Sequence, residues 1–259
     1  ELTIGYERNR PDGKPYGKGI EWAYRKYLNG KDGRVLKQKI AKNQWKPIRD
    51  QNEIDPLDGY DVISTIDVYI QDIAHHALLK QLVEYNANHG CVIVMETATG
   101  KIRAISNLGK SPSKDSLYTE RDNYAIRELH EPGSTFKLVG LMALLEEGKV
   151  DTTDIYDTNG GVDVYRGAHV RDSKKGGYGK ISLARGMELS SNTVIVKAVY
   201  NEFKNRPKDF LNYVDKWNLG KPLGLPFEGE GKPKVPRPGQ QNWSAIALQW
   251  MAFGYGIEI

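Results

Sequence analysis

The sequence predicts an α/β fold of the α+β sandwich type, in which helices cover an antiparallel sheet. Residues 91–107 hold two β-rich runs around a turn that ends in Gly100, a pattern typical of a hairpin. Apolar residues recur at helical spacing over 70–82, just before this hairpin, and again over 136–145. Helices that alternate with a hairpin favour a layered domain built around one sheet.

The composition is that of a globular protein. Of the 259 residues, 39% are hydrophobic and 27% charged, which allows a sizeable core. The 37 basic and 33 acidic side chains are dispersed, so the net charge of +4 indicates no nucleic-acid partner. The single cysteine, Cys91, excludes an internal disulfide, and its apolar surroundings predict a buried structural thiol. The five histidines lack metal-ligand spacing.

No stretch is predicted to cross a membrane, because the chain has no run of 18 apolar residues. No signal peptide is visible at its start. Since the chain does not begin with Met, we expect a soluble fragment of a longer protein.

The elements up to the hairpin follow from local signals. Residues 1–57 are polar, with a short helix predicted over 20–28 and a short strand over 34–40. Residues 59–67 predict a strand because β-branched side chains gather there. Asp67 is then expected to cap the helix that leads to the hairpin.

Beyond the hairpin, loops and helices alternate. We expect loops over 111–127, over 151–178 with a small hairpin, and over 221–241. The remaining segments are predicted to be helices, namely 134–147, which Gly148 ends, 182–189, 193–203, 207–220 and 242–252. The first of these is apolar nearly all round, which predicts a buried helix.

Ser134 and Lys137 form the first candidate site. They follow a Pro-Gly turn and lie three residues apart, hence on one face of the expected helix. A buried lysine has a lowered pKa, and its neutral amine can take the proton of a serine hydroxyl. The pattern occurs a second time, at Ser111 and Lys114, in a polar segment expected to be a solvated loop. A capping serine followed by a lysine is the structural alternative for Ser134.

Ser190-Ser191-Asn192 forms the second candidate site, and it lies between two expected helices. Taken alone, this segment favours a helix cap, since Ser and Asn are common at that position. The functional alternative is a Ser190 hydroxyl that relays a proton and an Asn192 amide that binds a substrate carbonyl.

Together these motifs resemble the ordered signature of class B penicillin-binding proteins, most closely the division-type (septal) peptidoglycan D,D-transpeptidases. The resemblance covers nearly the whole chain, and the set is specific although each piece is weak. Its parts are Gly19-Ile20-Glu21 with Tyr24, Leu28, Gly30 and Gly33; Asp58-Gly59-Tyr60-Asp61-Val62; Thr65-Ile66-Asp67; Thr97-Ala98-Thr99-Gly100; Glu131-Pro132-Gly133-Ser134-Thr135-Phe136-Lys137; Ser190-Ser191-Asn192; and Phe253-Gly254-Tyr255-Gly256.

The resemblance implies the penicillin-recognising serine transpeptidase fold, which is also that of β-lactamases. Residues 1–57 would be the last part of a non-catalytic pedestal domain, although an extended segment packed on the next domain is an alternative. Residues 58–259 would be the transpeptidase domain. Its third catalytic motif, Lys-[Ser/Thr]-Gly, is absent from the sequence. We therefore expect the domain to be incomplete at its C-terminus, without its last strands, and weak or inactive as this chain alone.

The resemblance also implies roles for the candidate residues. Ser134 would attack the penultimate D-Ala carbonyl of a peptidoglycan stem pentapeptide, with Lys137 as general base. Ser190 would pass a proton to the leaving group, and Asn192 would bind the substrate amide. No metal or organic cofactor is needed, and β-lactams would trap Ser134 as an ester.

The family further implies a place and partners in the cell. The protein would work at the outer, periplasmic face of the cytoplasmic membrane, held by an N-terminal anchor outside this chain, together with other cell-division membrane proteins. Two alternatives remain. One is a D,D-carboxypeptidase or serine β-lactamase, against which the upstream motifs argue. The other is a β-lactam sensor or non-catalytic scaffold that is acylated without turnover.

Overall fold

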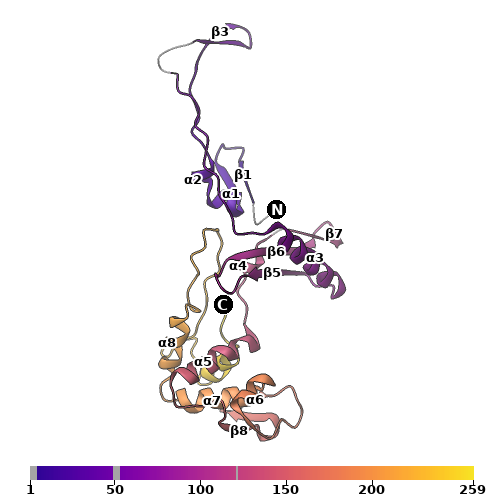
Figure 1. Ribbon diagram of the computed structural model, residues 1–259, viewed down its shortest axis with the longest axis vertical. Helices are drawn as coiled ribbons and strands as arrows, with labels where there is room; N and C mark the ends of the chain where they lie inside the picture. The colour runs from indigo at the N-terminus through magenta and orange to yellow at the C-terminus, as the bar shows by residue number, and fades with distance from the viewer. Residues whose placement is uncertain (1–4, 49–52, 121) are drawn as a thin grey trace. The chain divides into compact units, whose positions relative to one another are not determined.

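The computed structural model describes residues 5–48, 53–120 and 122–259, and the chain divides into two compact units. Unit 1 holds the chain up to Arg127 together with Leu225–Glu230. Unit 2 holds Glu128–Gly224 and Gly231–Ile259. Figure 1 shows both units with their helices and strands. The predicted domain boundary between residues 57 and 58 lies inside unit 1 and stays a prediction.

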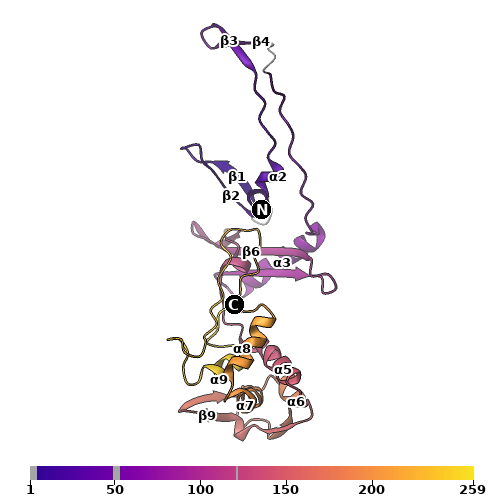
Figure 2. The same ribbon diagram turned by 90° about the vertical axis from the view of Figure 1, so that its left-hand side faces the viewer.

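The N-terminal part of unit 1 consists of short elements. Residues 31–34 run antiparallel to 54–57, as Figure 2 shows below the hairpin of β3 and β4. The helix predicted over 20–28 is broken at Tyr24, where the backbone leaves the helical region. The elements are β1 (Tyr6–Asn9), β2 (Pro15–Lys18), α1 (Gly19–Ala23), α2 (Arg25–Leu28), β3 (Leu36–Ala41) and β4 (Gln44–Ile48).

A three-stranded antiparallel sheet with one long helix forms the rest of unit 1 (Figure 1). Asp67 caps this helix by accepting the backbone N–H groups of Tyr69 and Ile70, as predicted. The sheet order is β5-β6-β7, and a four-residue helix follows it. The elements are α3 (Val68–Glu84), β5 (His89–Met95), β6 (Ile102–Ser111), β7 (Lys114–Thr119) and α4 (Tyr124–Arg127).

Three predictions for unit 1 are wrong. The described residues 59–67 form no strand, because they are paired only at isolated points: Tyr60 N–H donates to Tyr27 O, Asp67 N–H to Arg103 O and the Thr65 hydroxyl to Ile102 O. Residues 111–127 hold β7 and α4 rather than a continuous loop. Cys91 is exposed, because alternate residues of a strand face opposite sides and only the face of β5 that carries Gly90 lies on α3.

Unit 2 is mainly helical, and α7 lies at its centre. The buried core of this unit includes Val194, Ile195 and Val199 of α7, each with none of its surface exposed. The expected small hairpin within 151–178 is confirmed, as β9 and β10. The elements are η1 (Gly133–Phe136), α5 (Lys137–Glu146), β8 (Ile155–Asp157), η2 (Asn159–Gly161), β9 (Val162–Tyr165), β10 (Ala168–Arg171), β11 (Lys180–Ser182), α6 (Leu183–Glu188), α7 (Asn192–Phe203), α8 (Pro207–Lys216) and α9 (Ala247–Ala252).

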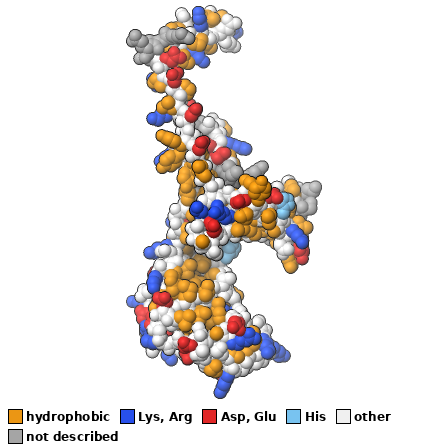
Figure 3. Space-filling view, viewed as in Figure 1, with side chains coloured by type: hydrophobic (Ala, Val, Ile, Leu, Met, Phe, Trp, Pro, Cys, Tyr) orange, Lys and Arg blue, Asp and Glu red, His pale blue; other side chains and the backbone are white. Residues whose placement is uncertain are grey.

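Helix α5 is not buried all round, contrary to the prediction. One stripe packs against α7 and α9, with Gly140 close to Val199 and Ala252. The opposite stripe is only partly covered, and Leu138 is 51%, Leu145 41% and Met142 38% exposed there. Hydrophobic side chains gather on this side of unit 2 in Figure 3. The apolar sequence therefore predicted the helix correctly but not that one of its faces is open.

The last predicted helix is shorter than expected. Residues 242–246 form turns, in which Ala247 N–H bonds to Ser244 O three residues back, and the helix begins at Ala247. Among the residues that the structure describes, none of the helices combines the length and the apolar character that crossing a bilayer requires.

Candidate active site

Ser134 lies on a single 3-10 turn, η1, directly before α5. The turn is entered through Gly133, whose φ of +57° is in the left-handed region that favours glycine. The Ser134 side chain is exposed, and its hydroxyl makes no hydrogen bond with any described residue. Ser134 is thus an exposed residue on a 3-10 turn, directly before the helix that Lys137 begins.

Lys137 is the first residue of α5 and has only 1% of its surface exposed. Its Nζ atom donates to the backbone carbonyl of Ser190 at 2.6 Å and contacts Ser190 Oγ at 3.0 Å. Burial lowers the pKa of the Lys137 ammonium to about 8, while the nearby charge of Asp172 raises it. A substantial share of this amine is therefore neutral, and able to accept a proton, at mildly alkaline pH.

The Ser-Ser-Asn segment serves both as a helix cap and as a neighbour of Lys137. Ser191 is the N-cap of α7 and accepts the backbone N–H of Val194 at 3.2 Å. Ser190, one residue earlier, has φ of +52°, and this left-handed turn places its carbonyl and hydroxyl on Lys137. The helix cap is therefore Ser191, whereas the contact with Lys137 belongs to Ser190, whose role as a proton relay stays a prediction.

Asn192 begins α7 and is partly exposed. Its side-chain Nδ2 donates to the carbonyl of Arg171 at 2.6 Å, at the end of β10. The structure therefore joins Lys137 directly to Ser190, with Asn192 two residues further along the chain. Within the described residues, the side-chain hydrogen bonds of Lys137 go to Ser190 and not to Ser134.

The segment Phe253-Gly254-Tyr255-Gly256 holds the turn that carries Ser134. Gly133 N–H donates to Gly254 O at 2.9 Å, and Gly256 N–H donates to a Glu131 carboxylate oxygen at 2.7 Å. A Cβ atom on Gly254 would lie 1.9 Å from Gly133 O, so only glycine fits there. Two motifs that are more than a hundred residues apart in the sequence are therefore in direct contact.

Sequence analysis missed Asp172, the residue after β10. Its Oδ1 accepts the Ser191 hydroxyl and the Thr193 N–H, each at 3.0 Å, and its Oδ2 accepts the Thr193 hydroxyl at 2.8 Å. The sequence holds no signal for this role, because Asp172 lies in a Gly-rich segment without hydrophobic periodicity.

The second Ser-x-x-Lys copy lies in unit 1. Ser111 and Lys114 are paired across the tight turn between β6 and β7. Ser111 is 8% exposed, and its hydroxyl lies 2.9 Å from that of Ser113. This copy is a hairpin turn rather than a helix start.

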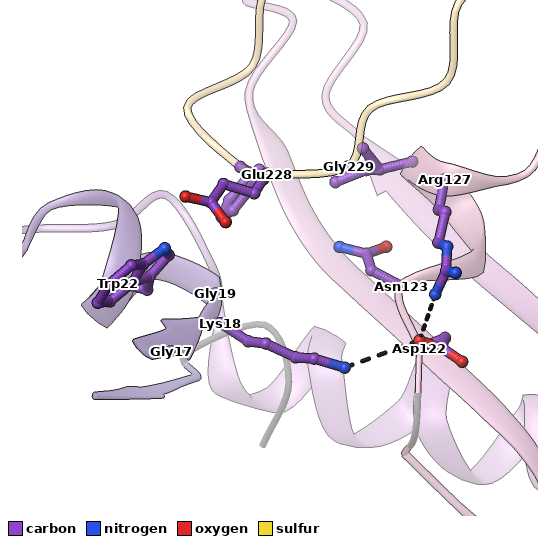
Figure 4. Close-up of a pocket in the computed structure, with 11 residues that line it drawn as sticks. Gly17, Lys18, Gly19, Trp22, Asp122, Asn123, Arg127, Glu228 and Gly229 are labelled. Carbon is purple, nitrogen blue, oxygen red and sulfur yellow. Dashed lines mark hydrogen bonds and ion pairs between the residues drawn. The ribbon is translucent and has the colours of Figure 1, made fainter. Parts of the chain in front are cut away.

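Unit 1 also contains a cavity of about 410 Å³, shown in Figure 4. Lys18 and Arg127 both contact Asp122 on its wall, at 3.7 and 2.8 Å. Trp22 borders it, and the indole N–H of this residue is buried without a hydrogen-bond partner among the described residues. The cavity holds none of the four predicted site residues. No cluster of His, Cys, Asp and Glu that could hold a metal ion occurs within the described ranges.

Comparison with known proteins identifies both the sequence family and the fold that this chain resembles. A family model described as "Penicillin binding protein transpeptidase domain" matches residues 90–259. The chain is 28% identical over 260 residues to a "Probable peptidoglycan D,D-transpeptidase PenA" of Neisseria flavescens, covering 96% of this chain and 60% of that protein. It is 29% identical over 248 residues to "Stage V sporulation protein D" of Bacillus subtilis, covering 93% and 37%.

Solved structures are similar as well. A peptidoglycan synthetase from Bifidobacterium adolescentis matches with a TM-score of 0.79 and 24% identity, over 98% of this chain and 45% of that chain. A transpeptidase domain of penicillin-binding protein 3 from Burkholderia pseudomallei matches with a TM-score of 0.64 and 26% identity, over 78% and 55%. This chain spans 60% or less of the curated relatives named here.

Proposed function

Because this chain belongs to the penicillin-binding protein transpeptidase domain family, we propose that it carries the acylation site of a peptidoglycan D,D-transpeptidase. The substrate would be a peptidoglycan stem pentapeptide, and the reaction would cross-link two stems. The single observation that carries the proposal is the buried Lys137 amine, which is hydrogen-bonded to Ser190 and has a pKa lowered to about 8.

In the proposed acylation, the Ser134 oxygen attacks the penultimate D-Ala carbonyl of the stem. The neutral Lys137 amine takes the hydroxyl proton, once substrate binding brings Ser134 within reach. Ser190 already contacts the amine at 3.0 Å, so it can pass a proton toward the departing terminal D-Ala. The ester on Ser134 is then released by an amine of a second stem.

Asn192 would bind the substrate amide. Its Nδ2 atom donates a hydrogen bond to the Arg171 carbonyl, which fixes the orientation of the side-chain amide. The residue is also partly exposed. We also propose that β-lactams, which present a reactive amide in the same place, acylate Ser134. No step in this scheme uses a metal or an organic cofactor.

The setting in the cell is a further part of the proposal. Relatives include "Peptidoglycan D,D-transpeptidase FtsI" of Escherichia coli, 24% identical over 93% of this chain. By analogy the protein would act in septal wall synthesis at the periplasmic face of the cytoplasmic membrane, anchored outside this chain and working with other division proteins. Fractionation of cells that express the complete protein tests the location.

The fate of the acyl-enzyme tests the activity. The protein is incubated with a peptide that ends in D-Ala-D-Ala and with an amine acceptor, and the products are identified by mass spectrometry. A peptide joined to the acceptor supports the transpeptidase. Release of the shortened acid alone would indicate a carboxypeptidase or β-lactamase, and a stable ester without turnover would indicate a sensor or scaffold. Ser134→Ala serves as the control that forms none of these.

A further inference from the structure

We propose that Asp172 is a positioning residue of this site, which holds the Ser190–Asn192 segment in place against Lys137. The inference rests on the proposed function for its catalytic consequence, but the contacts that carry it belong to the structure. None of the sequence motifs includes Asp172.

Asp172 is bonded to both neighbours of Asn192. Its carboxylate accepts three hydrogen bonds, from the Ser191 hydroxyl, the Thr193 hydroxyl and the Thr193 N–H, at 2.8 to 3.0 Å. Ser191 and Thr193 are completely buried. Hydrogen bonds to a charged acceptor are stronger than neutral ones, and buried donors left without a partner destabilise the fold. The start of α7 is therefore tied to this carboxylate, in addition to the backbone bonds from Ser190 N–H to Met187 O and from Ser191 N–H to Gly186 O.

The carboxylate is itself fixed by the backbone around it. Asp172 N–H donates to Gly161 O at 2.9 Å, which joins it to the end of η2, directly before β9. The preceding residue, Arg171, accepts the Asn192 amide through its carbonyl at 2.6 Å. The end of β10 thus contacts Ser191, Asn192 and Thr193 in succession.

This contact reaches Lys137 through Ser190. Ser190 precedes the anchored residues and has a left-handed backbone, which costs energy for a residue other than glycine and persists only where its surroundings hold it. Its carbonyl and hydroxyl both meet Lys137 Nζ. If Asp172 no longer holds Ser191 and Thr193, the left-handed turn can relax and Ser190 can leave the amine.

Asp172 also acts on Lys137 through its charge, which favours the protonated amine and opposes the effect of burial. Other charged side chains on the helices packed against α5 have partners elsewhere. They are Lys197 with Asp163, Glu202 with Arg206, Asp209 with Arg206, Asp215 with Arg237 and Lys216 with Glu146. Lys208 on α8 is the remaining charged group of those helices. The pKa of Lys137 is set by burial and by Asp172, and Lys208 is not among its causes.

Two substitutions separate the charge of Asp172 from its position. Asp172→Asn keeps the shape and the oxygen that accepts from Ser191 and from the Thr193 N–H, but removes the charge. The titration midpoint of Lys137 should then fall further, by roughly one pH unit. Asp172→Ala removes the contacts as well, and the plateau rate of β-lactam acylation at high pH should fall by up to about 100-fold, since small displacements of catalytic groups have effects of this size.

The midpoint is read without reference to activity. In protein carrying ¹³C-labelled lysine, the Cε resonance of Lys137, assigned by its loss in Lys137→Met, is followed against pH. One control is matched to the charge variant. Glu188→Gln removes an exposed carboxylate two residues before Ser190, and solvent screening should leave the midpoint unchanged.

An unchanged acylation plateau per folded molecule in Asp172→Ala would overturn the positioning role, and an unmoved Lys137 midpoint in Asp172→Asn would overturn the effect of its charge. If Asp172→Ala does not fold, Thr193→Val, which removes one of the three hydrogen bonds and keeps the charge, takes its place, and an unchanged acylation plateau in that variant would overturn the positioning role. If the unaltered protein is not acylated at Ser134, the proposed function fails instead, and the lysine titration still tests Asp172.

Discussion

The two Ser-x-x-Lys segments have the same sequence pattern but lie in different structures, one at the start of a helix and the other at a hairpin turn. Ser134 and Lys137 lie at the start of a helix, with the serine exposed and the lysine 1% exposed. Ser111 and Lys114 face each other across a hairpin turn, and Ser111 is 8% exposed. A spacing of three residues places side chains on one face of a helix, whereas in this hairpin it only closes a turn.

The difference shows that the environment of the lysine, rather than the spacing, creates the candidate site. At Lys137, burial between α5 and the Ser190 turn removes water from the ammonium and lowers its pKa to about 8. The turn before Ser134 is in addition held by Gly254, through the bond from Gly133 N–H. The Ser-x-x-Lys pattern alone predicts neither the burial of Lys137 nor the bond between Gly133 and Gly254.

The largest expected effect separates the two serines. Ser134→Ala should abolish covalent labelling by a fluorescent penicillin, because the proposed ester forms on the Ser134 hydroxyl. Ser111→Ala should leave labelling unchanged, since its hydroxyl is bonded to Ser113 in unit 1. Gel fluorescence of both variants checks this, with circular dichroism as the control for folding. Loss of labelling in Ser111→Ala alone would reverse the assignment of the two segments.

Substitution of Lys137 should have the next largest effect on acylation. Lys137→Met keeps the length of the side chain but removes the base, and the acylation rate should fall by about 100- to 10,000-fold. Lys149→Met, which alters an exposed lysine paired with Glu202, is the matched control and should acylate normally. Stopped-flow measurement of the second-order rate constant decides. A rate for Lys137→Met close to that of its control would mean that another group is the base.

Gly254→Ala tests whether the clamp on the Ser134 turn matters. Gly254 has φ of +86°, and a Cβ atom there would meet Gly133 O at 1.9 Å, so the turn must shift. We expect the acylation rate to fall by about 100-fold and the melting temperature to fall as well. In Gly256→Ala the new Cβ has no neighbour nearer than 3.8 Å, so only the backbone strain at φ of +67° remains. Equal acylation rates for the two variants would show that the clamp is dispensable.

The pH dependence gives the most gradual of these effects, about tenfold for each pH unit. Acylation needs a neutral amine, and the pKa of Lys137 is lowered to about 8. The rate should therefore rise with pH, about tenfold per unit below that value, and level off above it. The second-order rate constant measured from pH 6 to pH 10 checks this. A profile that is flat over this range would contradict a titrating lysine base.

The sequence predicted helices and turns correctly where the spacing of apolar residues and the capping or turn residues indicate the same element. Asp67 caps α3 as predicted, and the hairpin with φ of +70° at Gly100 is confirmed. The α+β transpeptidase fold is confirmed by the likeness to solved penicillin-binding structures. The strand over 59–67 was wrong, because β-branched residues favour extended backbone but do not supply a partner strand. The predicted burial of Cys91 and Leu138 was wrong, because an apolar side chain does not reveal which face of its strand or helix is covered.

For the site, the two motifs assigned Lys137 and Ser190 to one catalytic site, and the structure places these residues in contact. The roles of these residues and of Ser134 and Asn192 stay predictions. Asp172 could not be found, because a single carboxylate in a Gly-rich segment has neither periodicity nor a motif. Its importance depends on the fold of β10 beside α7, which is a tertiary contact.

The most direct test of the central claim is a peptide map of the unaltered protein after reaction with a penicillin. The adduct, located by tandem mass spectrometry after proteolysis, identifies the nucleophile without any substitution. The account predicts a single acyl adduct on Ser134, with the peptide containing Ser111 unmodified. An adduct on Ser111, or none on Ser134 under conditions that label the protein, would contradict it.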